Sequence, residues 1–172
     1  MFQHTPAQPK VPSVLILGAL TAAALGIATV ESAPTANATC VSFFGLGSGG
    51  QCTSTITSIA IAIGENAEAH ADGLLGAALT LGSNSSATTF AGSLFNLATT
   101  LGNSNGAFAG GIGSLALVAS GINQVVLAGE SPTSGDFGNI AASFGAPEGG
   151  DTIAKGVGNI SVNLFGSGDL DG

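Results

Sequence analysis

Side chains able to do acid–base or nucleophilic chemistry are few in this chain. Beyond Ala38 it has one histidine, His70, and one lysine, Lys155, and it has no arginine anywhere. His70 stands two residues before Asp72, but no nearby serine has the surroundings of a nucleophile elbow. Glu65 and Glu68 lie too close together in one unit to face each other across a cleft, as glycoside hydrolysis requires. The sequence therefore predicts a protein that is not an enzyme and that binds no cofactor.

Acidic residues dominate the charge, and this excludes several classes of partner. Ten Asp and Glu stand against two Lys, a formal net charge of -8. Nucleic-acid binding is excluded because basic residues are too few to neutralise phosphates, and anionic membrane surfaces are disfavoured for the same reason. Glycine-rich turns around Asp151, Asp169 and Asp171 resemble calcium-binding turns. Such sites need the motif in register on neighbouring coils, and here it is isolated, so no metal site is predicted.

Two cysteines, Cys40 and Cys52, are the only ones in the chain. Their spacing is not CxxC and no further thiol or imidazole lies nearby, so we expect a structural disulfide rather than a metal or redox pair. Closing a loop of this size stabilises a fold by about 3 kcal/mol. The bridge is predicted to hold residues 39–57 as a cap over the first repeat.

The N-terminal segment, residues 1–38, has the features of a signal peptide. Residues 1–10 are polar, residues 11–30 are apolar or small, and Ala36-Asn37-Ala38 is a small-x-small cleavage site. We expect a helical leader and a mature chain that begins at Thr39, secreted or held in the cell envelope. The alternative is an uncleaved anchor, because the apolar run is near the length that spans a bilayer. The leader is then the only expected contact with a membrane.

A seven-residue pattern beginning at Ser58 recurs along the rest of the chain. It returns at residues 76, 96, 114, 139 and 159, so each repeat has a length of about 18 to 25 residues. Apolar residues alternate with small ones, which indicates a strand, and recurrence at a longer period indicates a solenoid. The predicted fold is all-β: a parallel β-solenoid, or β-roll, of about six coils over residues 58–172, with residues 129–138 as an extruded loop.

Each strand of the pattern has two faces, and we assign the larger aliphatic side chains to the interior. These occupy the second, fourth and sixth places, as Ile59, Ile61 and Ile63 do in the first repeat. The third and fifth places are small or weakly polar and are assigned to an outward, flat interaction face, suited to a partner or to self-association. The face comprises Ala60, Ala62, Ala78, Thr80, Ala98, Thr100, Ala116 and Val118.

Residues 58–69, with the sequence Ser-Ile-Ala-Ile-Ala-Ile-Gly-Glu-Asn-Ala-Glu-Ala, resemble the head repeats of trimeric autotransporter adhesins. The resemblance extends over residues 58–130 and implies a left-handed parallel β-roll. The period is longer here and no stalk sequence follows, so adhesin function is not implied. The whole chain also resembles small secreted, Ala/Gly/Asn-rich mycobacterial proteins, which implies a secreted or cell-envelope location.

The function expected from these features is that of an exported structural or adhesive protein. It would bind a protein or a cell-envelope surface, or a second copy of itself, through the Ala/Thr face. One alternative is ice binding, because ordered alanine and threonine ladders template water. The other is a calcium-binding β-solenoid.

Overall fold

The computed structural model describes residues 39–48, 50–130, 133–146, 149–166 and 170–171. The predicted leader, residues 1–38, lies outside the described residues. Every regular element within them is a strand. The strands are β1 (Thr39–Phe43), β2 (Leu46–Ser48), β3 (Cys52–Ser54), β4 (Ile59–Ile63), β5 (Glu68–Ala71), β6 (Ala77–Leu81), β7 (Ser86–Thr89), β8 (Leu97–Asn103), β9 (Gly106–Ala109), β10 (Leu115–Ile122), β11 (Gln124–Ala128), β12 (Ile140–Ala146), β13 (Gly150–Ala154), β14 (Ile160–Leu164) and β15 (Leu170–Asp171).

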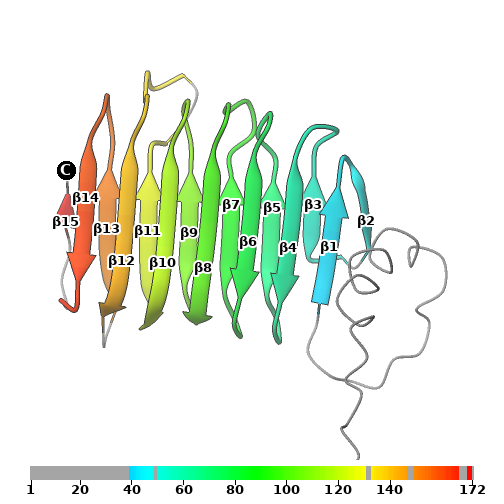
Figure 1. Cartoon of the computed structure of the whole chain (residues 1–172), viewed down its shortest axis with the longest axis horizontal. Coiled ribbons are helices and arrows are strands. Elements are labelled where there is room, and N and C mark those ends of the chain that lie inside the picture. The colour runs from blue at the N-terminus through cyan, green and yellow to red at the C-terminus, as the bar shows by residue number, and fades with distance from the viewer. Residues whose placement is uncertain (1–38, 49, 131–132, 147–148, 167–169, 172) are drawn as a thin grey trace, which may run out of the picture. The chain divides into compact units, whose positions relative to one another are not determined.

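The chain winds between two sheets, which confirms the predicted parallel β-solenoid. Sheet A has the order β14-β12-β10-β8-β6-β4-β1-β2, and sheet B has the order β15-β13-β11-β9-β7-β5-β3. Even-numbered strands from β4 to β14 pair in parallel in sheet A, and Figure 1 shows them side by side in one layer. Five turns join these six strands, each of which contains one repeat of the sequence pattern.

The register between coils follows the repeat of the sequence. Ala60 pairs with Ala78, Ala78 with Ala98, and Ala98 with Ala116, so equivalent places of the pattern form columns along the solenoid. At the corner before each sheet A strand from β6 to β14, isolated parallel bridges make a third line of contact between coils. Its residues are Leu74, Leu94, Ile112, Phe137 and Val157.

The N-terminal strands form a cap on the first coil, and β1 runs antiparallel to the strand that it covers. Strand β1 pairs antiparallel with both β4 and β2, whereas every later neighbour of a sheet A strand is parallel. The predicted disulfide between Cys40 and Cys52 is present, and because Cys40 lies in β1 and Cys52 in β3, it links sheet A to sheet B. Closing this loop contributes about 3 kcal/mol in the chain-entropy account. The bond indicates an oxidising, extracytoplasmic compartment.

The interior of the solenoid is the reverse of the one predicted from the sequence. The small residues fill it: Ala60, Ala98 and Ala116 are fully buried. The largest fully buried side chains are Gln124, Val118 and Val126, and the larger aliphatic residues point outward. In the first five turns the connection from sheet A to sheet B is four residues or fewer. Such short connections hold the two sheets close together, so that only small side chains fit between them.

Buried polar side chains at the corners add hydrogen bonds to this core of small residues. Asn96 lies 3% exposed, donates from Nδ2 to the Gly111 carbonyl and accepts from the Ser114 amide at 2.7 Å. At the opposite corner Asn105 donates to the Gly121 carbonyl at 3.1 Å and accepts from the amide of Gln124. Because each amide side chain satisfies the backbone of the following coil, these bonds fix the register between coils.

Candidate functional site

The outward side of sheet A is the most unusual surface in the described part of the chain. Its columns contain the second, fourth and sixth places of every repeat, and we call them face A. The members of face A are Ile59, Ile61, Ile63, Ala77, Leu79, Leu81, Leu97, Thr99, Leu101, Leu115, Leu117, Ala119, Ile140, Ala142, Phe144, Ile160, Val162 and Leu164. Thr99 is the one polar member. A solvated side of a sheet usually carries more polar residues than this, so face A is the candidate interaction surface of the described residues.

Face A is accessible as well as apolar. Ile63 and Leu97 are both 41% exposed, and Leu164 at the last sheet A strand is 62% exposed. None of the sheet A strands contains a charged residue. The described acidic side chains lie in turns, in sheet B or in the 129–138 loop.

The interaction face predicted from the sequence is not a surface, and that prediction is wrong. All eight of its residues are buried, at 2% exposure or less. Thr80 shows their role, because its hydroxyl donates to the backbone carbonyl of Glu68 at 2.6 Å and so links the two sheets across the interior. An ice-binding ladder built on Thr80 and Thr100 would face the interior, so these residues cannot meet ice. The eight residues are Ala60, Ala62, Ala78, Thr80, Ala98, Thr100, Ala116 and Val118.

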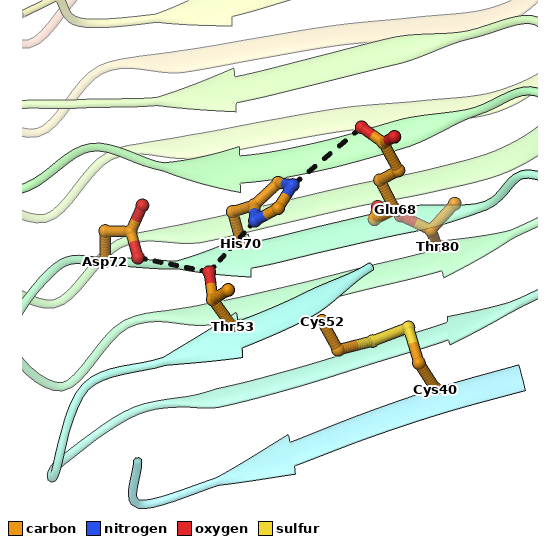
Figure 2. A network of polar contacts seen from close by, with 7 residues as sticks. All are labelled: Cys40, Cys52, Thr53, Glu68, His70, Asp72 and Thr80. Carbon is orange, nitrogen blue, oxygen red and sulfur yellow. Dashed lines mark hydrogen bonds and ion pairs between the residues drawn. A yellow bond between two sulfur atoms is a disulfide. The ribbon is translucent and has the colours of Figure 1, made fainter. Parts of the chain in front are cut away.

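A polar network on the outer side of sheet B contains the single histidine of the described residues. Thr53 Oγ1 lies 2.9 Å from His70 Nδ1 and 3.3 Å from Asp72 Oδ1 (Figure 2). His70 Nε2 lies 3.8 Å from a carboxylate oxygen of Glu68. The threonine hydroxyl has one proton, so when it donates to Asp72 the imidazole must donate to the hydroxyl. Thr53, Glu68 and Asp72 are exposed to water. The contact of Thr53 with His70 joins β3 to β5 and stabilises this strand pair.

The structure describes two of the three calcium candidates. Asp151 is exposed on β13, Asp171 lies on β15 opposite Ile153 in the register, and Asp169 lies outside the described residues. Among the residues that the structure describes, no group of three or more His, Cys, Asp or Glu side chains is arranged to hold a metal ion.

The chain was compared with protein families, curated proteins and solved structures. No family model matches the chain. Neither a curated protein nor a solved structure matches it significantly. In the part of the chain that the structure describes, no helix is long and apolar enough to cross a membrane.

The extruded loop is held to the solenoid by Asp136, which sequence reasoning missed. Asp136 is 5% exposed and accepts hydrogen bonds from the Glu130 amide at 2.6 Å and the Ser134 hydroxyl at 2.5 Å. It also accepts from the Gly156 amide, on the next coil, at 2.5 Å. Lys155 pairs with Glu130 beside it. Burial alone would raise the pKa of Asp136, but these hydrogen bonds and the Lys155 charge outweigh burial and hold the pKa below its usual value.

We expect Asp136 to make the stability of the protein depend on pH. Because the pKa is lower in the folded chain than the ordinary 3.8, the contribution is complete well above that value. It declines as the pH falls below the ordinary value and is lost once the pH has fallen through the folded pKa. Asp136→Asn should lower the free energy of unfolding at neutral pH by about 1–3 kcal/mol, since its amide cannot accept all these bonds. Urea unfolding between neutral and acidic pH measures both effects.

The exposed acid Glu65 offers a matched control for the loss of one charge. Glu65→Gln should leave the free energy of unfolding nearly unchanged and the acid-induced decline intact. An Asp136→Asn protein with wild-type stability at neutral pH would show that the loop is not held by this carboxylate.

Proposed function

We propose that this chain is an exported, non-enzymatic structural or adhesive protein of the cell envelope or the surrounding medium, and that it acts through face A. The observation that carries the proposal is an uncharged aliphatic surface spread over six strands of a chain whose net charge is -8. Five residues along a strand and six strands across span about 17 Å by about 29 Å, or about 500 Å². Exposed apolar patches of this size commonly serve binding.

Three further observations support export and a surface role. The disulfide between Cys40 and Cys52 needs an oxidising compartment. Residues 1–38 have the composition of a signal peptide. The likeness of residues 58–69 to adhesin head repeats, and of the whole chain to small secreted mycobacterial proteins, is in keeping with the same location.

Export and retention of the full chain with its own leader test the proposal. The chain would be produced in a secreting bacterial host, and cytoplasm, envelope and medium would be separated and assayed for the protein and its free thiols. We expect the protein outside the cytoplasm with both cysteines oxidised. Leu79→Lys, which puts a charge on face A, should reduce retention on isolated envelopes several-fold.

Thr88→Lys is the matched control, because Thr88 is a partly exposed residue on the outer side of sheet B. It adds the same charge without touching face A, so retention should stay at the wild-type level. A protein that stays in the cytoplasm with reduced thiols contradicts export. Equal retention of wild type and Leu79→Lys contradicts a role for face A.

A further inference from the structure

We propose that a second copy of this chain covers face A, giving a two-fold dimer in which the two A sheets pack against each other. This inference rests on the proposed function in taking face A as the interaction surface, and it adds the identity of the occupant. Two sheets that pack face to face lie about 10 Å apart and interdigitate their side chains. In a two-fold interface the same surface serves both copies, so face A must be complementary to itself.

The available area is sufficient for a stable dimer. The cap extends the apolar surface, since Val41 pairs with Ile61, Phe43 pairs with Ile59, and Leu46 pairs with Phe43. Paired residues project from the same side of a sheet, so these side chains continue face A. Eight strands then span about 38 Å, and two flat faces of this length bury about 1,300 Å² together. This exceeds the roughly 1,000 Å² expected of a biological interface.

The distribution of charge favours a second copy over a lipid surface. Each chain carries a formal charge of -8, but the sheet A strands contain no charged residue, so the dimer buries no charge. An anionic bilayer would repel the acidic chain. Lys155 is the single lysine of the described residues and already pairs with Glu130. The remaining repulsion between two acidic copies is screened by salt, so dimerisation should tighten as ionic strength rises.

Sedimentation velocity of the full chain, recovered from an exporting host, tests the dimer. From low to high micromolar concentration we expect a shift from monomer to dimer, and a larger dimer fraction in added sodium chloride. Leu79→Lys should raise the dissociation constant at least about 100-fold, because the dimer would bury two unpaired ammonium groups. Thr88→Lys should dimerise as the wild type does.

A second variant keeps the test usable if Leu79→Lys fails to fold. Leu164→Lys changes a side chain that is 62% exposed, so it loses little packing and should still weaken the dimer. Circular dichroism and the thermal midpoint establish that each variant is folded. A wild-type chain that stays monomeric at every concentration overturns the proposal. So does a dimer that either folded lysine variant on face A leaves unchanged.

The outcomes also separate this inference from the proposed function. A monomeric chain that still binds isolated envelopes, and loses that binding in Leu79→Lys, supports the proposed function and overturns the dimer. Binding of a monomeric chain to neutral lipid vesicles through face A overturns the dimer in favour of a lipid occupant. A dimer weakened by Leu79→Lys in a chain found only in the cytoplasm supports this inference and contradicts export.

Discussion

Ala98→Leu is expected to destabilise the solenoid by about 1–3 kcal/mol, whereas Leu97→Ala, one residue earlier, should cost less than about 1 kcal/mol. Ala98 is fully buried and pairs with Ala78 on one side and Ala116 on the other. Its column has no room for three more carbon atoms between two closely spaced sheets. Leu97 is 41% exposed, so truncating its side chain removes a surface that is only partly buried in the monomer.

Urea unfolding followed by circular dichroism measures both changes. The protein should be dilute enough to be monomeric, because Leu97 belongs to face A and association would add to apparent stability. The pair of variants tests the orientation of the strands directly. A Leu97→Ala protein that is less stable than Ala98→Leu would mean that the larger side chains form the interior after all.

The sequence predicts the winding of the chain well because winding depends on period alone. Each predicted strand of the repeat coincides with a sheet A strand, as residues 58–64 do with β4. The turn after β4 has positive φ at Gly64 and Asn66, two residue types that favour this conformation. The cap and its disulfide could also be predicted, since two cysteines with no other thiol or imidazole nearby favour a structural bridge.

The orientation of the strands could not be derived from alternation, because a period of two defines two faces and does not say which one is buried. The general preference of large aliphatic residues for the interior favoured the wrong face. A different signal in the sequence favours the right one. The third place is small in all six repeats, whereas the fourth ranges from Ile61 to Ala142. A closely packed interior limits the side-chain volume in its columns, and an outer face does not.

The polar contacts between coils could not be predicted from the sequence, for a separate reason. Thr53 meets His70 across 17 residues, and Asp136 meets the Gly156 amide across 20. Each pairing joins one coil to the next, so it depends on the register between coils and on the side to which each residue points. Once the register is known, these partners follow from the ladder, as Thr53 opposite His70 does.

Gly82→Ala should destabilise the protein by at least about 3 kcal/mol, through backbone strain added to a direct clash. Gly82 has a φ of 142°, and a Cβ placed there would lie 1.7 Å from the carbonyl oxygen of Gly102 in the next coil. Gly64, one coil earlier, has the same relation to Gly82, with 2.0 Å between its Cβ position and the Gly82 oxygen. The neighbouring oxygen belongs to the backbone, so relieving the clash would require the coils to separate.

Gly113→Ala is the control that isolates the clash from positive φ alone. Gly113 has a φ of 68° and nothing lies within 4 Å of its Cβ position, so the substitution should cost only about 1–2 kcal/mol. Urea unfolding of both variants at the same low protein concentration gives the difference. If Gly82→Ala costs no more than Gly113→Ala, the coils are not stacked closely at this corner.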